Sequence, residues 1–270
     1  MTEQDVAAPS GGTSRRFGVA LRHRDLRTLA LAFITDGGSS WSYSVVLTAY
    51  VFNRTHSASW VTALVTVHWV VGMLVGGYAG VIADRYDRRS VLLVSSLLSA
   101  ATTLGIAALV GFRSPLWLLV AGTSVLTVVA SPIRPASGAL IPEVVPESDL
   151  VAANAMFSML ESVVIVVGPG IGALLLLTGD PVYGVLINTA GYAVSAAFYV
   201  MLRVRSTGSA EAGGKAFTQW LSGVTTLVQH HKALVLTIFL LLDSAACNVA
   251  GVQMPALSRH LHQGRRGTAC

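Results

Sequence analysis

Four ionisable side chains lie inside long apolar segments, where a charged group could couple an ion or bind a polar ligand. They are Asp36, His68, Glu161 and Asp243. An unpaired charge at the centre of a bilayer costs about 2.5 to 3.5 kcal/mol on insertion scales, so each must be shielded, paired or neutral. Asp36, Glu161 and Asp243 are therefore candidate coupling or gating residues, whereas His68 is expected to be packed and neutral.

A charged decapeptide separates two of these apolar segments. Residues 80–89 read GVIADRYDRR, and the flanking residues 60–81 and 90–112 contain no formally charged side chain. Each flank is long enough to cross about 30 Å of hydrocarbon as a helix. The six residues 84–89 are too few for a domain and too polar for lipid, so we expect them at one face of a membrane.

The composition is that of a polytopic membrane protein. Of the 270 residues, 11% are charged and 53% are hydrophobic, and the mean hydropathy is +0.65. A water-soluble chain of this size would expose several apolar runs. The formal net charge of +5 comes from basic residues beside apolar segments, so it indicates topology and not nucleic-acid binding. The two cysteines support neither a disulfide framework nor a metal site.

The apolar segments predict an all-α fold, a polytopic bundle of seven membrane-crossing helices. The predicted crossings are residues 29–52, 60–81, 90–112, 116–133, 152–177, 182–202 and 233–257. Prolines 142 and 146 are expected to keep residues 134–156 from forming one long helix, so this stretch is predicted to join the fourth and fifth crossings as a loop.

The basic residues predict the orientation of these helices. With a cytoplasmic N-terminus, thirteen of the 18 Lys and Arg residues precede, follow or join helices on the inner side. The outer loops hold only Arg54 and Arg113, and the tail after the seventh segment adds three more basic residues on the outer side. We therefore expect a multi-pass protein of the cell membrane. Its expected regions are a cytoplasmic N-terminal arm (1–28), a six-helix half (29–202), a cytoplasmic linker (203–232), a seventh transmembrane helix (233–257) and a basic tail (258–270).

The decapeptide resembles the signature loop between the second and third helices of the major facilitator superfamily. An aspartate stands at position 87 where the general pattern has glycine, a departure that the drug- and siderophore-exporter branch shares. The resemblance implies a conformational latch formed by Gly80, Asp84, Arg85, Arg88 and Arg89. It also implies that the chain holds the first six-helix half and the first helix of the second half, as a fragment or a natural truncation after the seventh helix.

A second motif lies in the fifth predicted crossing. The run VVGPGIGALL contains Gly168, Pro169 and Gly172, and it resembles the G-P-x-x-G signature of the superfamily's exporters. Proline kinks a helix, and glycines spaced by four allow another backbone to approach closely. The glycines at 72, 76 and 80 recur with the same spacing in the second crossing, where they serve either ordinary helix packing or a sliding surface.

The carboxyl groups in the apolar segments can be interpreted in more than one way. The exporter branch often has an aspartate-glycine pair where Asp36 stands, so we favour a gating role over a packing role there. Glu161 could carry a proton, or could accept a hydrogen bond from a neighbouring helix without a role in transport. Asp243 could act in the second half.

The resemblance implies secondary active efflux of a small amphipathic compound, of drug or siderophore type, by alternating access. A cation, with the proton as the candidate, would drive it. The sequence contains no activated nucleophile and no phosphate-binding loop, so we expect neither an enzyme nor a cofactor. The expected partners are the small-molecule substrate, the lipid bilayer and a second half or a homodimer copy, without nucleic acid. The competing interpretation is a non-transporting truncated membrane protein, or a half-transporter that scaffolds or regulates a partner.

Overall fold

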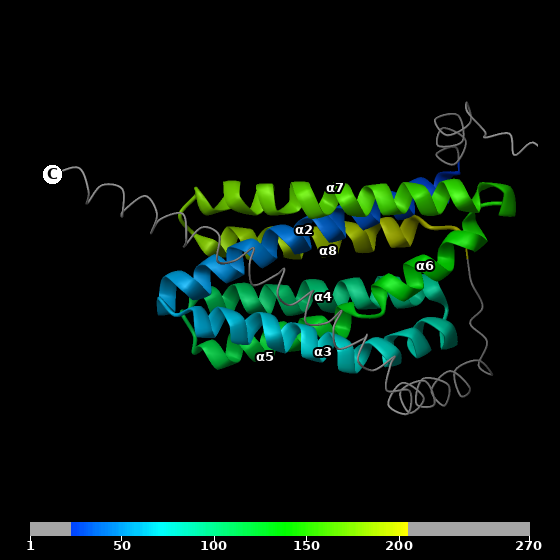
Figure 1. Cartoon of the computed structure of the whole chain (residues 1–270). Helices are drawn as coiled ribbons and strands as arrows, with labels where there is room; N and C mark the ends of the chain where they lie inside the picture. Colours follow the sequence, from blue (N-terminus) through cyan, green and yellow to red (C-terminus); the bar gives the residue numbers. More distant parts are fainter. Residues whose placement is uncertain (1–22, 205–270) are drawn as a thin grey trace, which may run out of the picture. The chain divides into compact units, whose positions relative to one another are not determined.

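The computed structural model describes residues 23–204, which belong to one compact unit and contain only helices as regular elements. Figure 1 shows these helices lying lengthwise beside one another. The elements are α2 (Arg24–Thr55), α3 (Ala58–Arg85), α4 (Arg88–Gly111), α5 (Leu116–Ala130), α6 (Ile133–Val144), the 3-10 helix η1 (Glu147–Asp149), α7 (Leu150–Leu176) and α8 (Pro181–Met201). The seventh predicted crossing, Asp243 and the predicted basic tail lie outside the described residues.

Five stretches of the described residues are long and apolar enough to cross a membrane. They are Ala58–Arg85, Arg88–Gly111, Leu116–Val144, Glu147–Leu176 and Pro181–Met201. The helix α2, at 32 residues, is also long enough, but its central run TDGGSSWSYS makes it too polar to meet the same criterion. The all-α membrane fold is confirmed, and the helices begin and end within a few residues of the predicted crossings except at the fourth.

The loop predicted for residues 134–156 is wrong over its first part, because α6 occupies Ile133–Val144. Pro135 lies in the first turn of α6, where backbone N–H groups have no intrahelical acceptor and proline therefore costs little. The helix also continues through Pro142 in its last turns. It ends at Val145, which is extended as expected for a residue that precedes a proline.

The helix α2 packs against α7 and α8, while α4 packs against α8 and α5. Glycines allow the α2–α8 contact. A Cβ atom on Gly191 would lie 2.0 Å from the Ser39 Oγ atom, and one on Gly184 would lie 2.6 Å from Val46 Cγ1. Real Cβ contacts are essentially never shorter than 3.0 Å, so these two glycines set how closely α8 can approach α2.

Buried hydroxyl groups tie the same helices together. Ser195 Oγ on α8 donates to the Ala32 carbonyl oxygen of α2 at 2.8 Å. Thr189 Oγ1 lies 3.1 Å from Thr103 Oγ1 on α4. Such interhelical hydrogen bonds contribute about 0.6 kcal/mol each in a membrane protein, so they support glycine packing and do not replace it.

At one end of the bundle, Arg54 joins the end of α2 to the connection between α4 and α5. Its Nη1 atom donates to the Ser114 carbonyl oxygen at 2.6 Å, and Nη2 donates to the Arg113 carbonyl oxygen at 2.7 Å. Nη1 also lies 3.2 Å from the Tyr50 hydroxyl oxygen. We call these contacts the Arg54 clamp.

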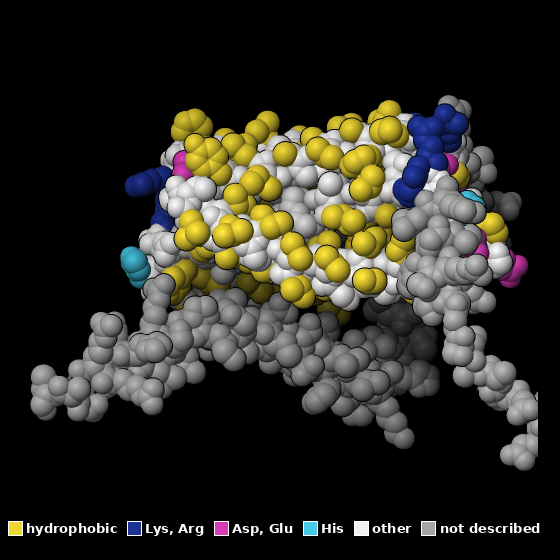
Figure 2. All heavy atoms as spheres, turned by 90° about the horizontal axis from the view of Figure 1, so that it is seen from above, with side chains coloured by type: hydrophobic (Ala, Val, Ile, Leu, Met, Phe, Trp, Pro, Cys, Tyr) yellow, Lys and Arg dark blue, Asp and Glu magenta, His cyan; other side chains and the backbone are white. Residues whose placement is uncertain are grey.

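Charge is distributed along the bundle as a membrane requires. Figure 2 shows a face on which hydrophobic side chains cover the length of the described helices, whereas charged side chains gather at the two ends. Exposed apolar residues such as Leu104, Val151 and Val166, at 55%, 77% and 74% exposure, would be costly in water and are favourable against lipid.

Candidate functional site

An ion pair lies between α6 and α7. The Arg134 Nη1 atom donates to Glu161 Oε1 at 2.6 Å. Because α6 begins at Ile133, Arg134 stands in a helix and not in the loop where the sequence placed it. Glu161 therefore accepts a hydrogen bond from a neighbouring helix and is not the lone carboxyl group that its surroundings in the sequence indicated.

Aromatic rings and a second carboxyl group complete this cluster. The Arg134 guanidinium lies 5.3 Å from the centroid of the Phe33 ring, a cation–π contact. Phe33 in turn meets Phe157 edge-on, with ring centroids 5.4 Å apart. Asp36 follows Phe33 by three residues on α2, which places the two on the same face of the helix. Asp36 is half-buried, and its carboxyl group has no hydrogen-bond partner among the described residues. We name Phe33, Asp36, Arg134, Phe157 and Glu161 the charged cluster.

The charged cluster lies well inside the membrane-spanning length. Glu161 follows the start of α7 by eleven residues, which is about 16 Å at 1.5 Å per residue. The Arg134 and Glu161 side chains are nevertheless 60% and 42% exposed. Charges at such depth face a bundle interior or a water-filled cavity and not lipid. The open side of the charged cluster is therefore the strongest candidate for a polar path through the described half.

The glycine motif of α7 packs against α2. A Cβ atom on Gly168 would lie 2.5 Å from Trp41 Cβ, and one on Gly172 would lie 2.6 Å from the Ser42 carbonyl oxygen. Ser42 Oγ lies 2.8 Å from the Gly168 carbonyl oxygen. The helix runs through Pro169 without interruption, as Figure 1 shows. The expected close approach is present, and its partner is α2, the helix that carries Asp36.

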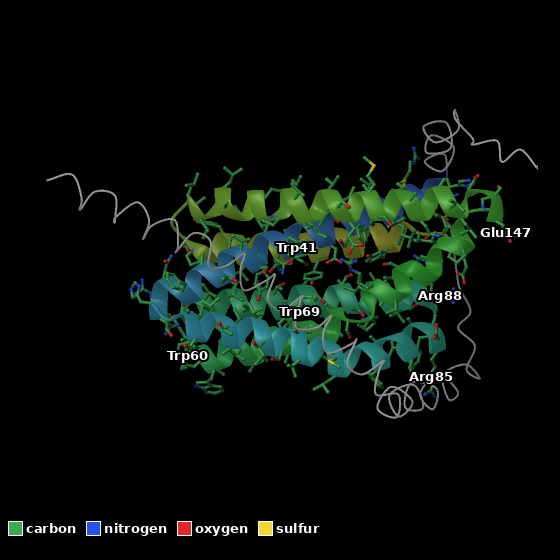
Figure 3. The ribbon with its side chains drawn as sticks, in the orientation of Figure 1. Trp41, Trp60, Trp69, Arg85, Arg88 and Glu147 are labelled. Carbon is green, nitrogen blue, oxygen red and sulfur yellow. The ribbon has the colours of Figure 1, made fainter. Side chains whose placement is uncertain are left out.

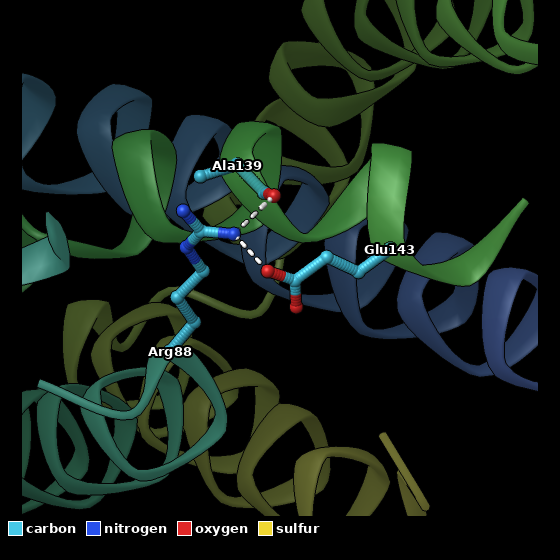
Figure 4. Close-up of polar contacts among 3 residues, drawn as sticks. All are labelled: Arg88, Ala139 and Glu143. Carbon is cyan, nitrogen blue, oxygen red and sulfur yellow. Dashed lines mark hydrogen bonds and ion pairs between the residues drawn. The ribbon is translucent and has the colours of Figure 1, made fainter. Parts of the chain in front are cut away.

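The charged connection between α3 and α4 is shorter than expected, and its arginines reach distant helices. Asp84 and Arg85 belong to the last turn of α3, whereas Asp87 caps α4 by accepting from the Ser90 backbone N–H at 3.0 Å. Arg88 Nη1 donates to the Ala139 carbonyl oxygen at 2.9 Å. The same atom pairs with Glu143 near the end of α6, as Figure 4 shows.

Arg89 makes the corresponding contact with α8. Its Nε and Nη2 atoms donate to the carbonyl oxygens of Tyr199 and Val200, at 3.1 and 2.6 Å. A cation at a helix C-terminus satisfies carbonyls that have no intrahelical donor and complements the helix dipole. Asp84 remains exposed and has no hydrogen bond or ion pair with the described residues. Arg88 and Arg89 therefore contact helices far along the chain, whereas Asp84 has no such contact with the described residues.

The α3 glycines remain largely open. A Cβ atom on Gly76 or Gly80 would meet nothing within 4 Å, and one on Gly72 would lie 3.7 Å from Thr127 Cγ2. Nearby, His68 Nδ1 lies 2.8 Å from Thr127 Oγ1 on α5. The His68 side chain is nevertheless exposed among the described residues, so the expectation of a packed residue is wrong. Trp69, labelled in Figure 3, stacks edge-on against His68 and is 50% exposed.

Comparison with known proteins decides the family. The model of the Major Facilitator Superfamily matches residues 29–265. The chain belongs to the Major Facilitator Superfamily. Its superfamily is one of membrane transporters, which agrees with the apolar helices and with the motif positions described above.

Relatives within the superfamily include proteins named as exporters. The chain is 25% identical over 244 residues to a Bacillus subtilis (strain 168) protein provisionally named bacilysin exporter BacE, covering 88% of this chain and 58% of that protein. It is 22% identical over 180 residues to the uncharacterised MFS-type transporter YfiS of the same strain, covering 66% of this chain and 42% of that protein. The chain thus spans about half the length of these superfamily members, 58% of BacE and 42% of YfiS.

Solved structures of superfamily transporters share the fold. One is a mutant peptide transporter POT in complex with sulfate, with a TM-score of 0.61 at 14% identity, covering 78% of this chain and 46% of that chain. Another is a POT family transporter in complex with a thioalcohol-conjugated peptide, with a TM-score of 0.58 at 16% identity, covering 87% and 52%. At such identities the likeness shows the superfamily fold alone.

The sequence interpretation of this superfamily member missed Arg134 as a site residue. The signal was present in Glu161, because a carboxyl group in an apolar helix requires a nearby cation. What concealed the pair was Arg134's position between two prolines, which indicated a loop.

Proposed function

We propose that the chain acts in secondary active export of a small amphipathic compound, by alternating access and with a cation, most simply the proton, as the driving ion. The observation that carries this proposal is the Arg134–Glu161 pair, charged and more than 40% exposed on membrane-spanning helices. A packed scaffold of helices has no need of charged groups at this depth, whereas a polar path does.

Two further features support export. One relative, BacE, is provisionally named an exporter, and the glycine-proline motif of α7 holds that helix tightly against α2. The motif therefore ties the helix that carries Glu161 to the helix that carries Asp36. The two carboxyl groups therefore belong to one packed pair of helices, so a conformational change that turns this pair would move both groups together relative to the rest of a transporter.

The test is transport in inside-out membrane vesicles from cells that express the chain. A fluorescent lipophilic cation and a siderophore-like dye serve as substrates, with an imposed proton gradient. Gradient-dependent accumulation that ceases on addition of a protonophore is expected. The control is an equal amount of vesicles from cells that lack the protein. Accumulation no greater than in this control would favour the competing role as scaffold or regulator of a partner.

A further inference from the structure

We infer that the charged cluster binds a zwitterionic molecule with an ammonium group, a carboxylate group and an apolar side chain, so that the exported compound is of amino-acid or short-peptide type. This inference rests on the proposed export function and names its substrate class. The evidence for it is the pattern of hydrogen-bond donors and acceptors in the charged cluster, some of which have partners among the described residues and some of which do not.

The free donors belong to Arg134. A guanidinium has five N–H groups, and the Arg134 guanidinium uses only Nη1 in a hydrogen bond with the described residues, the one to Glu161. Its 60% exposed side chain leaves the remaining donors accessible. Two parallel N–H groups of a guanidinium fit the two oxygens of a carboxylate, which makes Arg134 a receptor for that group.

The free acceptor belongs to Asp36. Its carboxyl group has no hydrogen-bond donor among the described residues although it lies half-buried in α2. A group in this state is costly unless a ligand or a proton completes it. An ammonium group supplies three N–H donors and a positive charge, so it satisfies Asp36 more fully than a neutral ligand can.

The charges of the charged cluster favour a ligand with both groups. Two carboxyl groups and one guanidinium give it one excess negative charge when all three are ionised. A carboxylate alone would add to that excess, and an ammonium alone would leave the Arg134 donors unused. A zwitterion satisfies both ends, while Phe33 and Phe157 offer ring surface to its apolar part.

The ion pair itself argues against a purely structural role for these residues. An ion pair within membrane-spanning helices that only stabilises a fold has its remaining donors and acceptors satisfied by surrounding groups. Here one donor of Arg134 is used, and both partners are substantially exposed. The charged cluster is thus incomplete in the described residues in the way that a binding site is incomplete without its ligand.

The test is binding to the full chain purified in detergent, measured by isothermal titration calorimetry. The probes are L-phenylalanyl-L-alanine, its C-terminal amide and its N-acetyl derivative, which remove the carboxylate and the ammonium in turn. We expect the zwitterionic dipeptide to bind at least about tenfold more tightly than either blocked form, as the loss of one charge-assisted contact requires. The N-acetyl form, an anion, should bind weakest.

Variants assign each end. Arg134→Gln should bind the dipeptide and its amide equally, and Asp36→Asn should bind the dipeptide and its N-acetyl form more nearly equally. Glu147→Gln, an exposed glutamate in η1 that precedes α7, is the matched control and should keep the full discrimination.

Three outcomes would overturn the inference: equal binding of the three probes by the unmodified chain, tighter binding of the amide than of the dipeptide, or no binding of any probe. In each case, export of the lipophilic cation in the vesicle assay would leave the proposed function standing. The converse result, discrimination among the probes without gradient-driven movement, would keep the binding site and remove the export function.

Discussion

Substituting Gly172 by alanine should separate α7 from α2 and lower the stability of the helical half. An added Cβ atom would lie 2.6 Å from the Ser42 carbonyl oxygen and 3.1 Å from its Cα atom, both of which are backbone atoms that cannot rotate away. Ordinary contacts begin at 3.4 Å, so relief requires a shift of one helix backbone against the other. Overpacking of this kind costs about 1 to 3 kcal/mol.

Gly170 supplies the control. It lies two residues before Gly172 in α7, and a Cβ atom there would meet nothing within 4 Å. Both substitutions gain the same helix propensity, up to about 1 kcal/mol for glycine to alanine. The difference between Gly172→Ala and Gly170→Ala therefore isolates the contact with α2. We expect Gly172→Ala to be the less stable of the two by about 1 to 3 kcal/mol.

The assay is equilibrium unfolding of the purified chain in mixed micelles, with increasing SDS fraction and tryptophan fluorescence as the signal. Trp41, one of the five tryptophans, reports on this contact directly, since its Cβ atom lies beside Gly168. Unfolding free energies of the two variants that agree within about 0.5 kcal/mol would refute the reasoning, because a surface-like substitution has that effect.

Three other predictions concern orientation, coupling and the charged connection. In a cysteine-free background, Tyr86→Cys should react with a membrane-impermeant thiol reagent only in opened cells and Ser57→Cys in intact cells; the reverse pattern would invert the proposed orientation. Glu161→Gln removes the negative partner of the ion pair and should abolish gradient-driven accumulation in vesicles while the protein still inserts; unchanged accumulation would return Glu161 to a structural role. Arg89→Gln should lose about 1 kcal/mol of stability with its two contacts to the end of α8. Arg85→Gln should lose less, because within residues 23–204 the Arg85 guanidinium contacts only the Tyr86 ring; equal losses would contradict the capping role.

The helices themselves were predictable because a membrane makes length and apolarity nearly sufficient signals. The prediction of residues 90–112, for example, differs from α4 by two residues at its start and one at its end. The fourth crossing was less accurate. Prolines around Arg134 indicate a break in a helix. A proline can follow the end of one helix or stand in the first turn of the next, and the local sequence does not specify which.

For the candidate site, the sequence predicts that certain residues need a partner, but it does not identify the partner. A carboxyl group at Glu161 requires a partner, but the partner stands 27 residues earlier in the chain and is brought close by the packing of α6 on α7. The contacts of Arg89 span 110 and 111 residues. For Gly172, the spacing of glycines predicts a close neighbour, and only the fold identifies that neighbour as α2.

The Arg54 clamp has a mechanical consequence. It fastens the end of α2 to the α4–α5 connection, while Arg88 and Arg89 fasten the start of α4 to the ends of α6 and α8 at the opposite end of the bundle. A set of rods bound at both ends resists shear between its members and transmits torque as one lever. Any rocking of these helices in a transport cycle should therefore turn them together, about a pivot that lies outside the contacts between them. Removing the Arg54 contacts or the Arg88 and Arg89 contacts should let the helices slide against one another during that rotation.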